Sequence, residues 1–388
     1  MREPWRFGAI IGITAVVASL ALPALAAPAA PRSAQAATAA TARPVYQLWS
    51  VSCPAAAKCL ALGGTFTVSN GDALVRLWNG KSWTAQRPLL PHAYLGAISC
   101  RYPRQCTAVG MTTAQHALAL RWNGRTWREQ RAPGNSSNLL SVSCPSATTC
   151  VAVGIAGSSG VAELWNGRGW FSRALPVSAY SIDRGMGAVS CSAVANCTAL
   201  GEQVTGQDIH QPLAEHWDGT AWTEQVMPGV ADTAEFVSVS CPNTGACVAV
   251  GNSPIDEGPL EPLAAAWSRA GWKLLPAAPH PDTYAALNGV SCTSARFCLA
   301  VGAACSPNVQ CEWAASTPGV TGLRALALRW NGRKWTTLRT PAPADTSLIS
   351  VSCSSWRACT AVGRSGSGLV AERWNGARWA RQRVPGAG

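Results

Sequence analysis

The stretch that decides the fold is Leu140-Ser-Val-Ser-Cys144, followed after five residues by Cys150-Val-Ala-Val-Gly154 and then by Glu163-Leu-Trp-Asn-Gly-Arg-Gly-Trp170. This unit recurs seven times in the 388-residue chain, at intervals of 44 to 61 residues. Repeats of this length are typical of propellers and solenoids. The repeat, more than any single motif, therefore determines the architecture.

Each unit predicts four strands, because its apolar runs are short and bounded by Gly, Pro, Asn and Ser. In the third unit we expect strands at 139–144, 150–154, 161–165 and 170–175. Asn166-Gly167 predicts a hairpin turn between the last two, since both residues tolerate positive φ. Small residues occupy the first two strands and paired tryptophans the last two, which suits a wedge that widens toward its rim. The sequence predicts an all-β fold, a seven-bladed β-propeller with four antiparallel strands per blade.

The chain divides into a leader, a linker and the repeats. Residues 1–26 have the charged start, apolar core and small-residue cleavage site of a secretory signal peptide, and an uncleaved membrane anchor is the alternative. Residues 27–43 are rich in Ala, Pro and Thr and predict a linker. We expect a secreted or cell-wall-associated protein that is not an integral membrane protein. The blades are expected at about 44–92, 93–137, 138–184, 185–233, 234–283, 284–346 and 347–388.

The sixteen cysteines form eight pairs with a separation of six residues. In an exported chain this spacing predicts one disulfide within each blade and an extra one in the sixth unit. Zinc is the rival interpretation, but one pair per blade keeps the thiols away from the four-ligand arrangement that zinc needs. The expected bridges are Cys53–Cys59, Cys100–Cys106, Cys144–Cys150, Cys191–Cys197, Cys241–Cys247, Cys292–Cys298, Cys305–Cys311 and Cys353–Cys359.

Charge is distributed unevenly along the chain, whose formal net charge is +12. Residues 185–268 contain ten acidic residues and no Lys or Arg. The rest of the chain after the signal peptide has 29 basic and 8 acidic residues, a net charge of +21. Blades four and five are therefore expected to form an acidic sector in a basic ring, and anionic wall polymers or membrane surfaces are candidate partners of the basic part.

Candidate binding residues lie in the loops that differ between units. Alternate connections of a four-stranded blade fall on opposite ends of the ring, and the two–three loops of units four to six are long. Variable loops on a rigid scaffold are where binding usually occurs, although these loops could also be tolerated insertions. The predicted binding residues are Asp208, Asp256, Glu257, Glu312, Trp313 and Tyr180.

The turn between the two tryptophans resembles a known motif. Trp122-Asn-Gly-Arg-Thr-Trp127 is similar to the Asp-box (BNR) turn of sialidase-type propellers, where a Gly-x-Thr-Trp ending joins strands three and four. Asp218-Gly-Thr-Ala-Trp222 is a looser relative, and the Ser-x-Asp beginning of the box is missing from every unit. The whole repeat also looks like that of secreted actinobacterial repeat proteins. The resemblance covers about 44–388 and implies the fold, with a structural role for the box.

Function is expected to be binding without catalysis. The leading hypothesis is recognition of an extracellular glycan, cell-envelope polymer or protein by a monomeric propeller that needs no cofactor, holds no metal and binds no nucleic acid. The alternative is a carbohydrate-active enzyme, a hydrolase or lyase, with carboxylates on the same loops. A passive scaffold that self-associates through its charge asymmetry is a third possibility. Calcium binding by the acidic sector is a further alternative, although the sequence contains no spaced calcium loop.

Overall fold

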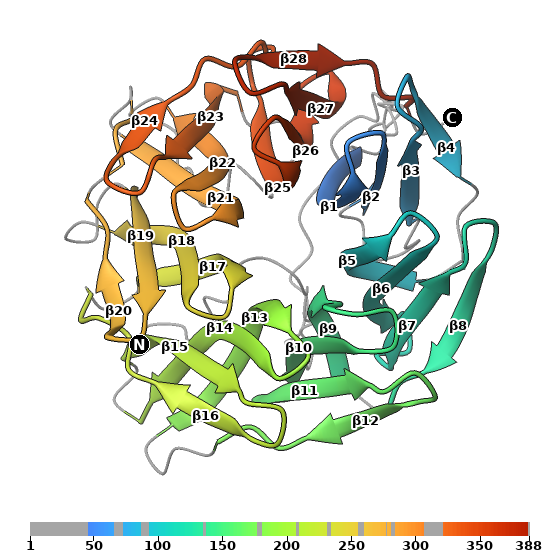
Figure 1. Cartoon of the computed structure of the whole chain (residues 1–388), viewed down its shortest axis with the longest axis vertical. Helices are drawn as coiled ribbons and strands as arrows, with labels where there is room; N and C mark the ends of the chain where they lie inside the picture. Colours follow the sequence, from blue (N-terminus) through green and yellow to red (C-terminus); the bar gives the residue numbers. More distant parts are fainter. Residues whose placement is uncertain are drawn as a thin grey trace, which may run out of the picture.

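Seven four-stranded antiparallel sheets surround a central channel in the part of the chain that the structure describes (Figure 1). The computed structural model describes residues 46–65, 73–86, 93–134, 137–176, 181–206, 209–230, 234–254, 260–276, 278–280, 284–305 and 321–386. Within each sheet the strands follow in chain order from the channel to the rim. These residues form strands and no helix, which confirms the predicted seven-bladed propeller.

Each blade consists of four consecutive strands. Blades one to three are β1 (Tyr46–Ala55), β2 (Lys58–Thr65), β3 (Leu74–Trp78), β4 (Trp83–Gln86); β5 (Ala93–Tyr102), β6 (Gln105–Thr112), β7 (Ala117–Trp122), β8 (Trp127–Arg131); and β9 (Ser137–Ser143), β10 (Cys150–Ala156), β11 (Ser159–Trp165), β12 (Trp170–Arg173).

The remaining blades have the same composition. Blades four to seven are β13 (Ser181–Ala193), β14 (Asn196–Thr205), β15 (His210–Trp217), β16 (Trp222–Gln225); β17 (Glu235–Asn243), β18 (Ala246–Pro254), β19 (Leu260–Ser268), β20 (Gly271–Leu274); β21 (Tyr284–Ser294), β22 (Phe297–Cys305), β23 (Leu323–Trp330), β24 (Trp335–Thr337); and β25 (Ser347–Ser355), β26 (Ala358–Ser365), β27 (Gly368–Trp374), β28 (Trp379–Gln382).

The antiparallel order gives the ring two different ends. The turns between strands one and two and between strands three and four lie at one end, which we call the turn face. The two–three and four–one connections lie at the other end, the loop face. The sequence-variable connections and the repeated turns are thus on opposite sides of the molecule.

A β-bulge in every first strand faces a glycine of the second strand. In blade six the register shifts between Leu287 and Gly289, next to Gly302 of β22. A Cβ atom on Gly302 would lie 1.8 Å from the carbonyl oxygen of Ala286, so only glycine fits. In blade three the equivalent glycine is Gly154. The sequence predicts that the second strand, at 150–154, ends there, whereas β10 continues through Gly154 to Ala156. The equivalents of Gly302 are Gly63, Gly110, Gly154, Gly201, Gly251 and Gly363.

The hydrophobic core lies between blades. Each of the seven interfaces contains a cluster that joins aliphatic residues of one blade to the tryptophan region of the next, for example Val362 and Ala371 of blade seven with Trp78 and Trp83 of blade one. The indole rings of Trp78 and Trp83 are tilted by 48° at a centroid distance of 5.7 Å. As predicted, the tryptophans fill the gaps that widen toward the rim.

The turns between strands three and four are capped by a side chain. In blade one, Asn79 Oδ1 accepts hydrogen bonds from the backbone N–H groups of Lys81 and Ser82, both at 2.9 Å. Gly80 has a positive φ of 102°, but Asn79 does not. The predicted hairpin is therefore confirmed, with positive φ at the glycine alone, while the asparagine stabilises the turn through its side chain.

One disulfide lies within each blade, across the first turn. All seven bridges that the structure describes in the blades join cysteines six residues apart, as predicted. Cys305, at the end of β22, is also disulfide-bonded, and its expected partner Cys311 lies outside the described residues. This disulfide content is typical of extracellular or other oxidising compartments.

A ring of serine hydrogen bonds joins the first strands of neighbouring blades. In each blade, the side-chain oxygen of the serine that precedes the first cysteine accepts a hydrogen bond from the next blade. The donor is the backbone N–H of the first cysteine of that next blade, and the distance is 2.9–3.0 Å in all seven interfaces. First strands are edge strands, whose outer N–H groups would otherwise lack partners in the sheet. The Ser-Cys dipeptide of the repeat therefore connects the blades around the channel.

The ring closes between blade seven and blade one without exchange of a strand. Ser352 Oγ accepts from Cys53 N at 2.9 Å, and Ser350 Oγ accepts from Val51 N at 3.2 Å. Near the rim, the Arg76 guanidinium donates to the carbonyl oxygens of Pro385 and Gly386, at 3.1 and 2.8 Å. Side chains thus close the ring.

We expect Ser352→Ala to weaken this closure. The substitution leaves the buried Cys53 N–H without its acceptor, which costs about 1–2 kcal/mol of unfolding free energy. Ser355→Ala, at an exposed position of the same strand, is the matched control and should change little. Chemical denaturation under oxidising conditions measures both, and equal stability of the two variants would contradict the role assigned to the serine ring.

Candidate functional site

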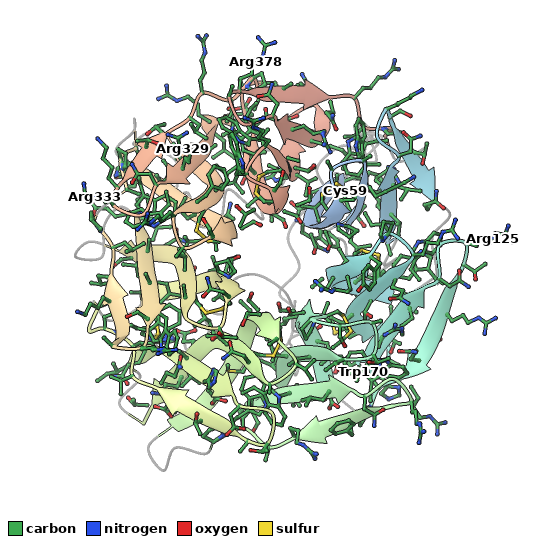
Figure 2. All side chains as sticks on the ribbon, viewed as in Figure 1. Cys59, Arg125, Trp170, Arg329, Arg333 and Arg378 are labelled. Carbon is green, nitrogen blue, oxygen red and sulfur yellow. A yellow bond between two sulfur atoms is a disulfide. The ribbon has the colours of Figure 1, made fainter. Side chains whose placement is uncertain are left out.

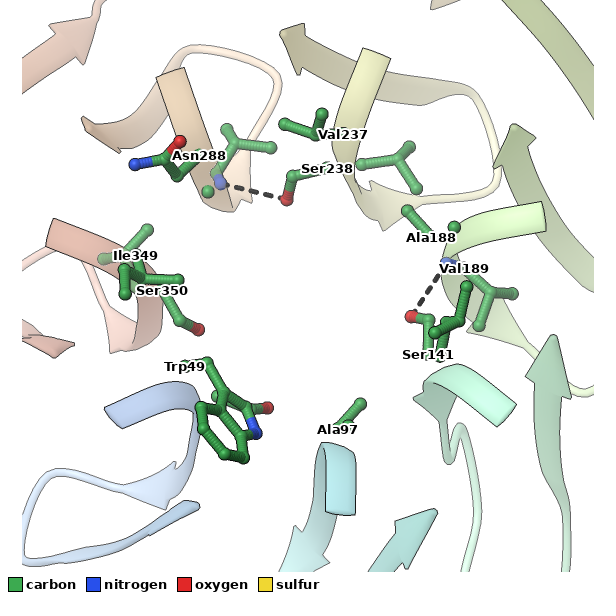
Figure 3. A pocket seen from close by; sticks show the side chains of 18 residues that line it. Trp49, Ala97, Ser141, Ala188, Val189, Val237, Ser238, Asn288, Ile349 and Ser350 are labelled. Carbon is green, nitrogen blue, oxygen red and sulfur yellow. Dashed lines mark hydrogen bonds between the residues drawn. The ribbon is translucent and has the colours of Figure 1, made fainter. Parts of the chain in front are cut away.

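The bulges place one side chain per blade around the central channel. The extra residue of each bulge lines a cavity of about 190 Å³ on the axis of the ring (Figure 3). Trp49 is the fourth residue of ten-residue β1 and Ile349 the third of nine-residue β25, so this circle lies toward the loop face. We call these seven the bulge residues: Trp49, Gly96, Leu140, Gly187, Val237, Asn288 and Ile349.

The bulge residues differ from one another although the frame around them is repeated. Two are glycines, four are apolar and one is an amide. The Trp49 indole N–H donates to the carbonyl oxygen of Leu95 at 2.6 Å, and Asn288 Nδ2 donates to that of Leu348 at 2.9 Å, so each side chain is held against the next blade. The seven-fold frame thus carries an asymmetric lining, which a specific binding site requires.

The cavity has an uncharged lining. None of the 18 residues that line it is Asp, Glu, Lys, Arg or His. Its volume is below the roughly 300–1,000 Å³ of sites that enclose a whole small molecule. The channel can therefore accept one neutral group that projects from a larger ligand, such as a sugar ring or an apolar side chain.

Acidic residues occur on the loop-face half of blades four and five. Glu235 begins β17, Glu261 is the second residue of β19, and Glu202 on β14 contacts His210 Nδ1 on β15. These positions flank the two–three loops of the two blades. Part of the acidic sector expected from the sequence thus lies at the loop face, whereas Asp218 lies in the three–four turn of blade four.

The six binding residues predicted from the sequence lie outside the described residues. Asp208, Asp256, Glu257, Glu312, Trp313 and Tyr180 all fall in connections of the loop face, and their roles stay predictions. Sequence reasoning did not identify the bulge residues. The sequence does contain a signal for them. The position between Leu139 and Ser141, and the equivalent position of each other unit, differs in residue type between units, whereas the positions on either side hold similar residues in all units.

Buried carboxylates occur between blades and not in the channel. Glu163 and Glu372 occupy equivalent positions, two residues before the first tryptophan of blades three and seven. Burial raises the pKa of each to about 7, opposed for Glu163 by a hydrogen bond from Ser172 and for Glu372 by the charge of Arg381. Perturbed pKa values can mark active sites, but these groups have no access to the channel lining.

In three blades, the residue directly before the first tryptophan packs its side chain on a tryptophan of the next blade. Arg121 lies over the Trp165 ring at 5.2 Å and Arg373 over Trp78 at 5.1 Å. His216 stacks on Trp267 with a centroid distance of 6.5 Å and an interplanar angle of 10°. His216 thus serves packing between blades, and no group of three or more potential metal ligands occurs among the described residues.

Comparison with known proteins identifies a fold and no family. No known protein family matches the chain, and no curated protein sequence is similar to it. Among solved structures, YCF48 bound to a D1 peptide has a TM-score of 0.54 at 12% identity, over 86% of this chain and 93% of that chain. The GH74 xyloglucanase from Xanthomonas campestris has a TM-score of 0.55 at 13% identity, over 88% of this chain and 55% of that one.

A third solved structure is similar at the same level. The β-propeller domain of the Trilobed protease from Pyrococcus furiosus, described as having an open velcro topology, has a TM-score of 0.53 at 7% identity, over 87% of this chain and 97% of that domain. These likenesses show the fold alone. In the described residues, no helix has the length and apolar character needed to cross a membrane.

Proposed function

We propose that this chain is a secreted, non-catalytic binding propeller that recognises an extracellular ligand at its loop face. The observation that carries the proposal is the circle of seven unlike bulge residues on an otherwise repeated frame. The leader peptide, the cell-wall association and the kinship with Asp-box-like actinobacterial repeat proteins belong to the same proposal. The ligand classes are a glycan, a cell-envelope polymer or a protein.

The loops of blades four to six would hold the ligand above the channel. Asp208, Asp256, Glu257, Glu312, Trp313 and Tyr180 belong by their place in the sequence to connections of the loop face, and we expect them to contact the ligand. One neutral group of the ligand would enter the channel beside the Trp49 ring, whose flat face suits a sugar or an apolar side chain. Charged and hydroxyl groups would contact the acidic loops.

Binding is favoured over glycoside hydrolysis by the chemistry of the channel. Hydrolysis needs two carboxylates about 5–10 Å apart around the scissile bond. The channel lining contains no carboxylate, and Glu163, Glu215 and Glu372 are buried between blades. The lining of the channel therefore offers no acid–base pair.

Removal of the Trp49 ring tests the proposal. We expect Trp49→Ala to weaken saturable binding to the best ligand of a glycan, wall-polymer and protein panel by about 10-fold, since burial of an aromatic ring contributes about 1–2 kcal/mol. Trp49→Phe should retain most of the affinity. Trp356→Ala removes the same side chain from an exposed position on the turn face and is the matched control.

Variants in the loops separate the possible outcomes. Loss of affinity in Trp49→Ala, Trp313→Ala or Asp256→Ala, with Trp356→Ala unchanged, supports the loop face as the ligand site. A chain that binds no member of the panel, or whose binding depends on Trp356 alone, contradicts the proposal. Turnover of a bound glycan would overturn its non-catalytic part.

A further inference from the structure

The turn face is strongly basic. In each blade, the segment between the two cysteines of the first turn and the segment between the two tryptophans lie at the turn face. Together these segments contain 12 of the 31 Lys and Arg residues of the chain and, with Asp218, only one of its 19 acidic residues. All twelve cationic side chains are exposed. They are Lys58, Lys81, Arg101, Arg104, Arg125, Arg168, Arg269, Arg296, Arg333, Lys334, Arg357 and Arg378.

The fold does not require these charges. In the capped turns, Asn79, Asn123, Asn166 and Asn331 bind the backbone N–H of the second residue after them, whose side chain projects into solvent. That second residue is basic in these four turns, whereas it is Thr220, Ala270 and Ala377 in the other three capped turns, so the backbone contact tolerates other side chains. Arg125, Arg333 and Arg378 extend outward from the ring (Figure 2). Turn formation therefore does not explain why the exposed side chains of this face are mostly basic.

The cations form an arc and do not cover the face evenly. Ten of the twelve lie in the consecutive blades six, seven, one and two, whereas blade four has none and carries Asp218. Two exposed aromatic rings lie in the same arc, Tyr102 and Trp356, and the neighbouring Arg101 and Arg357 are positioned over them at 5.6 and 4.2 Å. The arc thus combines many guanidinium groups with two aromatic rings, and an arginine already covers one face of each ring.

We infer that this arc, the turn-face residues of blades six, seven, one and two, binds a linear polyanion with phosphate or carboxylate groups along its length. Nine of the twelve cations of the face are arginines, which pair in bidentate fashion with such oxygens. A curved row of charges fits a chain-like ligand, and adjacent sites on one chain reinforce each other. A flat lipid surface would meet Asp218 as well and would find no free aromatic ring to insert.

This surface is separate from the ligand site proposed above, because it lies at the opposite end of the ring. A protein with both would hold an anionic polymer at its turn face while its loop face recognises a second ligand. The proposed function of the loop face can fail while the polyanion site stands, and the reverse also holds. Trp49→Ala distinguishes the two, since it should leave polyanion binding unchanged.

A triple variant with a charge-matched control tests the inference. Arg333→Gln/Lys334→Gln/Arg378→Gln removes three charges from the arc, at side chains for which the structure shows no hydrogen bond. Arg131→Gln/Arg339→Gln/Arg383→Gln removes three exposed charges from the loop-face ends of the fourth strands of blades two, six and seven. Both variants have the same net charge, so any difference between them reports on location.

Affinity for synthetic poly(glycerol phosphate), for polygalacturonate and for neutral dextran is measured between about 50 and 200 mM salt. We expect the arc variant to bind the polyanions about 10-fold or more weakly and to reduce the slope of log affinity against log salt by roughly two to three, as three ion contacts are lost. The control variant should stay within about two-fold, and dextran should not bind.

Three results would overturn the inference. Equal losses in the two triple variants would mean that net charge alone attracts the polymer. Absence of binding to both polyanions would exclude the site. Tight binding to vesicles that contain phosphatidylglycerol, with none to the soluble polyanions, would assign the face to membranes instead.

Discussion

Gly302→Ala is expected to prevent stable folding of blade six or to cost more than about 3 kcal/mol of unfolding free energy. The added methyl group would lie 1.8 Å from the carbonyl oxygen of Ala286, 2.9 Å from its carbonyl carbon and 3.0 Å from Leu287 Cα. All three contacts are with backbone, which cannot rotate away as a flexible side chain can. The bulge of β21 must therefore open, and Asn288 would leave the channel lining with it.

Gly169→Ala is the matched control for this substitution. Gly169 lies in the three–four turn of blade three, and a Cβ atom there would meet nothing within 4 Å. Thermal unfolding and the yield of soluble protein under oxidising conditions compare the two variants. A Gly302→Ala protein as stable as the Gly169→Ala protein would show that the glycine does not hold the bulge in place.

Glu372→Gln is expected to stabilise the protein above neutral pH and to have little effect below pH 5. The Glu372 carboxylate is fully buried on β27, and neither of its oxygens has a hydrogen-bond partner among the described residues. Burial disfavours the charged form and raises the pKa of Glu372 from 4.5 to about 7, while the positive charge of Arg381 on the adjacent strand opposes the shift.

The sign of the pH dependence follows from this pKa. Because the folded state holds the proton more tightly than the unfolded chain, the contribution to stability is complete below pH 4.5 and is lost as the pH rises through 7. The pKa of Glu163 is raised in the same way, so both residues act in one direction. Stability should therefore fall between about pH 4.5 and 7.

A glutamine at this position keeps the shape and removes the ionisation. We expect Glu372→Gln to raise the unfolding free energy at pH 8 by on the order of 1–3 kcal/mol and to flatten the pH profile. Denaturant unfolding at pH 4.5 and pH 8 measures the difference, with the exposed Glu129→Gln as control. The assignment is wrong if Glu372→Gln shifts stability equally at both pH values, or destabilises the protein at pH 8.

The acidic and basic residues are segregated in space as well as along the chain. Glu202, Glu235 and Glu261 flank the loop-face connections of blades four and five, whereas ten cations gather on the turn face of the other side of the ring. The sequence indicates which blades carry the acidic residues. It does not indicate at which end of the ring these residues lie, because that depends on the direction of each strand. The two ligand surfaces that we propose therefore differ in charge.

The amino-acid sequence by itself determined the seven blades, the four strands of each, the disulfide of every blade and the tryptophan packing between blades. These features are local or repeated: the Cys-x5-Cys pair spans one hairpin, and the Trp pair is five residues apart. A pattern that recurs seven times is read with little ambiguity, since each unit confirms the others.

Only the tertiary structure decided how the blades meet and what faces the channel. Gly154 ends an apolar run in the sequence, but in the fold it lies inside β10, opposite the bulge that turns Leu140 toward the axis. Ser352 Oγ accepts a hydrogen bond from Cys53 N, 299 residues away in the chain, and this contact forms only when the ring closes. Register and ring closure depend on contacts between distant segments, so no local pattern of residues encodes them.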